Sequence, residues 1–128
     1  MNCSLADGGR DAQRYETAKS AVINFFEARK NANKNLRSYY TNKYLDDRKV
    51  ANDQDFYYNV LQEENIIRYE IKSVDVAHDD SITAIVNLVI DGPGYKVDVL
   101  EKYVFLCQDN SCKADSRTVL QSRELPLK

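Results

Sequence analysis

The chain has little of several residues and features on which specialised functions depend. It has one histidine and no tryptophan among 128 residues, and its 18 Lys and Arg face 20 Asp and Glu for a net charge of −2. Because nucleic-acid binders need cationic surface to neutralise phosphates, we expect no nucleic-acid partner. No apolar run approaches the roughly 20 residues that cross a bilayer, so the sequence predicts no membrane-spanning helix.

Motifs of common enzyme and metal classes are also missing from the sequence. It has no glycine-rich phosphate loop, no Gly-x-Ser-x-Gly elbow, no His-Glu-x-x-His and no calcium loop. Cys107 and Cys112 lack the second pair or the nearby histidine that would complete a zinc site. We therefore expect neither a metal nor a cofactor. His78 lies beside Asp79 and Asp80 in an expected turn, which favours a solvated polar role.

The first ten residues differ in pattern from the rest. They lack hydrophobic periodicity and contain Gly8-Gly9, which predicts a flexible tether over residues 1–10 and a single domain over residues 11–128. Cys3 is similar in position to the lipid-bearing cysteine of bacterial lipoproteins. Under that interpretation Cys3 carries a lipid, which is the only membrane attachment we expect, and a signal peptide has been removed. Asn2 is a poor residue before such a cleavage, which argues against lipidation of Cys3.

The spacing of hydrophobic residues changes once along the chain. Apolar residues recur every three or four positions from Asp11 to about residue 30, then over 36–45, and again over 56–61, where Asn52 or Asp53 can cap a helix. After Asn65 the period becomes two, in four runs separated by short turns, with a bulge expected near Ser73. We therefore expect an α+β fold, with N-terminal helices packed against a curved antiparallel sheet of about four strands.

Cys107 and Cys112 flank a polar turn between the last two strand-like runs. A hairpin end can bring two such cysteines to disulfide distance. A disulfide implies an oxidising compartment, periplasmic or extracellular. The alternative is a cytoplasmic hairpin with two reduced thiols.

The expected order of elements, helices followed by four antiparallel strands, resembles that of the NTF2-like (cystatin-like) superfamily. The likeness covers about residues 12–122 and rests on Phe25-Phe26-Glu27-Ala28, on Leu36 to Leu45 and on the strands from Ile66 to Ser122, without a diagnostic short motif. It implies a sheet wrapped around the first helix as a cone with a pocket at its open end. The family includes isomerases and dehydratases, non-catalytic transport and secretion subunits, and small exported or lipid-anchored domains.

Tyrosines and one glutamate are the candidate pocket residues under this resemblance. Seven tyrosines could converge at the cone's mouth, where they would suit a small apolar ligand. We take six of them as ligand-binding candidates: Tyr39, Tyr40, Tyr44, Tyr57, Tyr69 and Tyr103. The seventh is Tyr95. The alternative is that each covers the core with its hydroxyl in water. Glu101 shares a strand face with Val97 and Phe105, as expected for a pocket acid with a raised pKa or for a structural ion pair.

The third strand is apolar on both faces. Leu100, Val104 and Leu106 alternate with the core-facing residues and need cover, either from a second chain in a homodimer or from Leu125-Pro126-Leu127. The sequence thus favours a non-enzymatic binding or scaffolding domain of a bacterial envelope or exported protein, which binds a partner protein or a small apolar molecule. The alternatives are a pocket enzyme of the isomerase or dehydratase type with Glu101 as acid/base, and a docking subunit of a secretion assembly.

Overall fold

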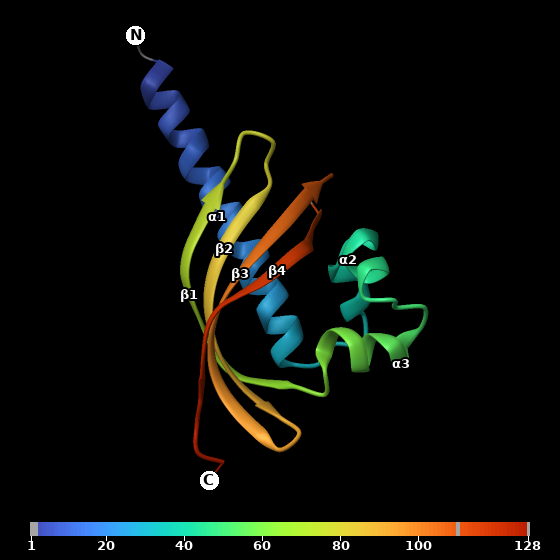
Figure 1. Ribbon diagram of the computed structural model, residues 1–128. Helices are drawn as coiled ribbons and strands as arrows, with labels where there is room; N and C mark the ends of the chain where they lie inside the picture. Colours follow the sequence, from blue (N-terminus) through green and yellow to red (C-terminus); the bar gives the residue numbers. More distant parts are fainter. Residues whose placement is uncertain (1–2, 110, 128) are drawn as a thin grey trace.

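The computed structural model describes residues 3–109 and 111–127, with side chains from residue 12 onward. Helices come first: α1 (Cys3–Lys30), the 3₁₀ helix η1 (Leu36–Tyr39), α2 (Asn42–Asp47), α3 (Asp53–Phe56) and the π-helical turn η2 (Tyr57–Leu61). The strands β1 (Asn65–Val76), β2 (Ile82–Gly92), β3 (Tyr95–Gln108) and β4 (Ser111–Glu124) follow. They form one antiparallel sheet in the order β1-β2-β3-β4, which curves around α1 (Figure 1). The expected α+β fold is confirmed.

Helix α1 is longer than the periodicity predicts. The sequence indicated a start at Asp11, yet the helix begins at Cys3, so the segment expected to be a tether is helical from that residue. Each residue added to an existing helix gains one hydrogen bond, and this offsets the low helix propensity of Gly8 and Gly9. In Figure 1 this first part of α1 extends past the edge of the sheet.

The residues expected as one helix over 36–45 form two elements, separated at Tyr40. Tyr40 has extended backbone angles and pairs with Ala114 of β4 in an isolated parallel bridge, where the Thr41 N–H donates to the Ala114 carbonyl at 2.9 Å. Thr41 then caps α2 by accepting from the Tyr44 N–H at 3.1 Å. Tertiary pairing with β4 therefore overrides the local helical pattern. The predicted cap of the next helix is confirmed at Asn52, which accepts from the Asp55 N–H at 2.8 Å.

Two bulges bend β1. The one expected near Ser73 is confirmed by a register shift between Ile71 and Ser73. A second shift, between Ile66 and Arg68, puts Ile66 in the core and leaves Ile67 43% exposed. Ile67 therefore points away from the core, because one extra residue reverses the side on which a strand residue points.

An aromatic core fills the space between α1 and the concave face of the sheet. Phe25 and Phe26 of α1 are buried, and Phe25 makes an edge contact with Phe105 of β3 at 5.1 Å between ring centroids. Strand β2 contributes the alternating residues that its pattern predicts: Ile82, Ala84, Val86, Leu88 and Ile90 are all buried. Edge-to-face ring pairs add about 0.5–1.5 kcal/mol each to the area that they bury. The cone-like interior is thus occupied by side chains of the protein.

Candidate functional site

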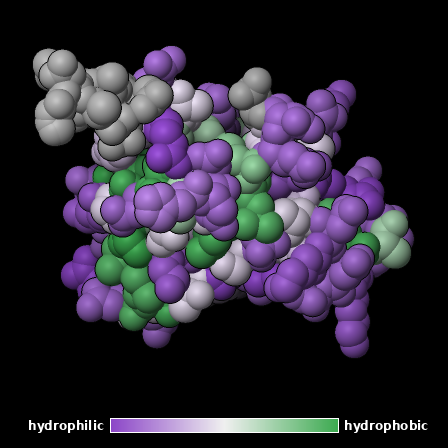
Figure 2. Space-filling model, turned by 90° about the horizontal axis from the view of Figure 1, so that it is seen from above, coloured by the Kyte–Doolittle hydropathy of each residue, from purple (hydrophilic) through white to green (hydrophobic). Residues whose placement is uncertain are grey.

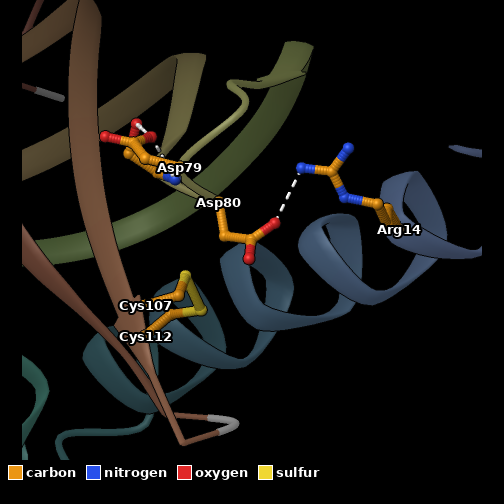
Figure 3. Close-up of a disulfide and its surroundings, with 6 residues drawn as sticks. Arg14, Asp79, Asp80, Cys107 and Cys112 are labelled. Atoms are coloured by element: carbon orange, nitrogen blue, oxygen red, sulfur yellow. Dashed lines mark hydrogen bonds and ion pairs between the residues drawn. A yellow bond between two sulfur atoms is a disulfide. The ribbon is translucent and has the colours of Figure 1, made fainter.

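A disulfide closes the end of the β3–β4 hairpin. Cys107 and Cys112 are direct cross-strand partners with Cα atoms 4.0 Å apart, and their sulfurs are bonded. The predicted disulfide is therefore present, and such bonds are typical of proteins that fold outside the reducing cytosol. Figure 3 shows the disulfide beside α1. Arg14 and Asp80 lie in the same region of the molecule (Figure 3).

Arg14 links α1 to the β1–β2 turn. Its guanidinium donates to the Ala77 carbonyl at 2.8 Å and to Asp80 Oδ1 at 2.7 Å (Figure 3). Asp79 in the same turn accepts from the N–H and the hydroxyl of Ser81, and these hydrogen bonds lower the pKa of its carboxyl group. The turn thus bonds directly to α1 at Arg14.

Two adjoining cavities lie along α1 at the hairpin end. The larger, of about 690 Å³, is bordered by the α1 residues Gln13 and Thr17 and by the disulfide. The smaller, of about 420 Å³, continues past Asn31 toward Tyr39. Both cavities are lined by Ala21, Asn24 and Cys112, so the disulfide stands where they meet. Amide and hydroxyl side chains along one face of a helix, above small apolar residues, can bind a ligand through hydrogen bonds without a strong charge preference.

The second feature is a buried ion pair inside the sheet. Glu101 is fully buried, and its Oε2 accepts a hydrogen bond from Arg117 Nη2 at 2.5 Å. A register shift in β4 leaves Asp115 without a partner on β3 and pairs Arg117 with Tyr103. Without that bulge Arg117 would point to the outer face, because each one-residue shift reverses the side. The same shift puts Ala114 and Thr118 on opposite faces: Ala114 is buried and Thr118 is exposed.

Phenols and a second guanidinium surround this pair. Arg29 Nη1 of α1 donates to the Tyr103 hydroxyl at 3.1 Å. Burial raises the pKa of Tyr40 to about 12 and that of Tyr103 well above 10, so both phenols stay protonated at neutral pH. We call Arg29, Tyr40, Glu101, Tyr103 and Arg117 the interior polar cluster. Tyr40 Oη and Glu101 Oε1 are buried and have no hydrogen-bond partner among the protein groups that the structure describes.

The structure brings only some of the candidate tyrosines together. Tyr40 and Tyr103 are buried against Phe25, and the Tyr39 ring contacts the same phenylalanine at 6.4 Å between centroids. Tyr44 is buried against Tyr40, with ring centroids 4.8 Å apart, and Arg48 lies over the Tyr44 ring. Tyr39 and the remaining candidates have other surroundings as well. Tyr39 borders the smaller cavity, Tyr69 donates to Glu27 at 2.5 Å, Tyr95 donates to Glu64, and Tyr57 is 47% exposed beside Tyr58. The buried tyrosines act as core residues, and they leave little space for an apolar ligand.

Glu101 occupies the core-facing position that its strand pattern predicts, and Arg117 supplies the structural ion pair weighed for it. A general base must reach its substrate with a free oxygen. Glu101 is fully buried, so neither of its oxygens is open to a substrate, and it borders neither of the two cavities at the hairpin end. Sequence reasoning missed Arg117 because the bulge that aims it inward leaves no mark in the local pattern of β4.

The outer face of the sheet carries the three residues expected at an interface. Leu100 and Val104 are half-buried, and Leu106 is 45% exposed. The described helices lie on the opposite, concave face (Figure 1). The C-terminal residues give little cover, since Leu127 is 67% exposed and Leu125 bonds to Lys96, near the opposite end of β3 from Leu106. Seen from above, hydrophobic side chains reach the surface in separate patches among hydrophilic ones (Figure 2).

Two further expectations concern the membrane and metals. The lipidation expected at Cys3 lies outside the residues whose side chains are described. Within residues 3–109 and 111–127, no helix is long and apolar enough to cross a membrane. The same residues contain no group of three or more His, Cys, Asp and Glu side chains that could hold a metal ion.

Comparison of the chain with protein-family models, curated proteins and solved structures found no match.

Proposed function

We propose that the chain is a non-catalytic binding domain of an exported bacterial envelope protein, with NTF2-like architecture, and that it binds an extended segment of a partner protein along α1. The observation that carries this proposal is the pair of adjoining cavities at Ala21, Asn24 and Cys112. The disulfide supports export, since such bonds persist in oxidising compartments. The order of a long helix and several short helices before a curved antiparallel meander supports the family resemblance.

The dimensions and chemistry of the two cavities suit a polypeptide segment. From Gln13 to its end at Lys30, next to Asn31, the helix rises about 26 Å at 1.5 Å per residue, which matches roughly eight residues of extended chain. The side-chain amides of Gln13, Asn24 and Asn31 can each donate to and accept from peptide groups. Ala21 and Ala28 between them allow a backbone to approach closely.

The test is selection of peptides from a random library against the oxidised protein. We expect the selected peptides to lose about tenfold or more in affinity with Ala21→Arg, which fills the place where the cavities meet. Glu16→Arg, an exposed α1 residue that borders neither cavity, is the matched control and should leave affinity unchanged. Failure to select any peptide, or equal affinity for both variants, would contradict the proposal.

A second candidate function is self-association through the outer sheet face. It is supported by the 45% exposure of Leu106 on a face that no described helix covers. Light scattering over a range of concentrations should show a dimer that Val104→Asp abolishes. Glu16→Arg, on the exposed side of α1 and away from the outer sheet face, is the control and should leave association unchanged. A monomer at all concentrations would exclude this function.

A further inference from the structure

The two cavities along α1 carry a charge imbalance that their amide and hydroxyl side chains do not explain. The smaller cavity contains the carboxylate of Glu27, and no Lys, Arg or His is among the described residues that line it. The larger cavity is lined by Arg14, Asp80 and Asp109. Each cavity therefore has one carboxylate more than it has cations.

The one cation among the described residues of the larger cavity is already paired. Arg14 donates to Asp80 Oδ1 at 2.7 Å, so these two charges offset each other (Figure 3). Asp109 follows β3 at the hairpin turn, is exposed, and forms no ion pair with the part of the chain that the structure describes. Its carboxylate is therefore open to a cation that enters this cavity.

Glu27 is held in position at the smaller cavity. The Tyr69 hydroxyl donates to Glu27 Oε2 at 2.5 Å, which leaves Oε1 able to accept. Tyr39 lines the same cavity, and the face of a phenol ring attracts positive charge. The side-chain oxygens of Asn31 and Ser111 can accept from an ammonium or a guanidinium group. These groups together suit the end of a lysine or arginine side chain.

We propose that the segment bound along α1 is basic and places one lysine or arginine side chain in each cavity, where one pairs with Glu27 and the other with Asp109. This inference rests on the peptide binding proposed above. The two cavities meet at Asn24 and Cys112, so one chain can supply both side chains. The helix amides bond to the peptide groups of any sequence, whereas the two carboxylates select for positive charge and disfavour an acidic segment.

Neutral isosteres of the two carboxylates test the charge preference. Glu27→Gln keeps an oxygen that accepts from Tyr69, and Asp109→Asn keeps a residue type that tolerates the φ of 52° at this position. For a peptide selected against the wild type, we expect each substitution to weaken binding about threefold, and the double variant about tenfold, in low salt. Glu16→Gln, which neutralises an exposed α1 carboxylate that borders neither cavity, is the matched control and should leave affinity unchanged. Added salt should weaken binding to the wild type more than binding to the double variant.

The selected peptides separate this inference from the proposed function. We expect peptides selected from a random library to be enriched in Lys and Arg, and to lose about tenfold in affinity when these residues are replaced by glutamine. Selected peptides without such enrichment, or with equal affinity for the wild type and the double variant, overturn the basic segment and leave the peptide site standing. If no peptide is selected, the peptide site itself fails and the basic segment falls with it.

Discussion

Arg117 reaches Glu101 from the neighbouring strand only because Asp115 is left out of the pairing between β3 and β4. The bulge places a guanidinium beside a carboxylate that is fully buried. The same bulge turns Asp115 toward Thr41, whose hydroxyl donates to Asp115 Oδ1 at 2.7 Å. One irregularity in β4 therefore fixes both an interior ion pair and a contact with the start of α2.

Removal of Arg117 alone should destabilise the fold strongly. Arg117→Met leaves the Glu101 carboxylate buried without its cation, and we expect a loss of about 3–5 kcal/mol in the free energy of unfolding. The double variant Arg117→Met with Glu101→Leu should recover most of this loss, because no unpaired charge then remains. Denaturant unfolding measures both. Arg123→Met, which breaks the exposed pair with Asp98, is the control and should cost less than about 1 kcal/mol. A double variant as unstable as the single one would show that packing, not charge, sets the cost.

The disulfide should stabilise the hairpin end more than the rest of the fold. For the short loop that it closes, the chain-entropy relation gives about 2 kcal/mol. We expect Cys107→Ser with Cys112→Ser to lower the Tm and to speed amide exchange near the hairpin end, while the β1–β2 pairing keeps its protection. Thiol titration of the unfolded, unreduced wild type should find one free thiol among its three cysteines. Three free thiols would mean that the bond does not form in the protein as isolated.

Thr41 should contribute to stability through both of its hydrogen bonds. Its hydroxyl accepts from the Tyr44 N–H at the start of α2 and donates to Asp115. Thr41→Val keeps the shape and removes both bonds, so we expect a loss of about 1–2 kcal/mol in unfolding free energy. Thr118→Val, an exposed residue of the same type on β4, should change it by no more than about 0.5 kcal/mol. Equal effects of the two variants would contradict a capping role.

The protein should lose stability in alkaline solution over a defined range of pH. In the unfolded chain each tyrosine has a pKa of about 10. Burial raises the pKa of Tyr40 to about 12. Burial together with a hydrogen bond to a glutamate raises the pKa of Tyr69 and of Tyr95 to about 12. Each phenol therefore contributes stability that is complete below pH 10 and is lost as the pH rises toward 12. For buried Tyr40 the slope in this range approaches about 1.4 kcal/mol per pH unit. Tyrosinate absorbance measured beside circular dichroism should show these phenols ionising together with unfolding, and early ionisation of all nine tyrosines would contradict it.

Periodicity predicted the parts of the fold that depend on local sequence. The alternation of Ile82, Val86 and Ile90 in β2 and the pairing of Cys107 with Cys112 follow from spacing alone, and both are confirmed. Residues whose conformation depends on distant partners were predicted poorly. Tyr40 leaves a helical pattern because its backbone pairs with Ala114, and Ile67 turns outward because of a bulge.

The candidate site was only partly visible in the sequence. Glu101 was identified from its place among apolar residues on β3, but Arg117 has no comparable signal because its direction depends on the register of β4. The cavities along α1 were not predicted either, since they form where side chains of a helix and a hairpin distant in sequence come close without filling the space between them.

The bridge between Tyr40 and Ala114 also has a kinetic consequence. Within the sheet each strand pairs with the next strand in the chain, so the sheet can form through short loop closures, whereas this bridge joins residues 74 positions apart. Long closures carry a larger entropy cost and tend to form late in folding. The segment from η1 to α2 is thus the natural last region to dock and the first to detach, and its release would expose Tyr40 and Tyr44 to water while all three strand pairings remain intact.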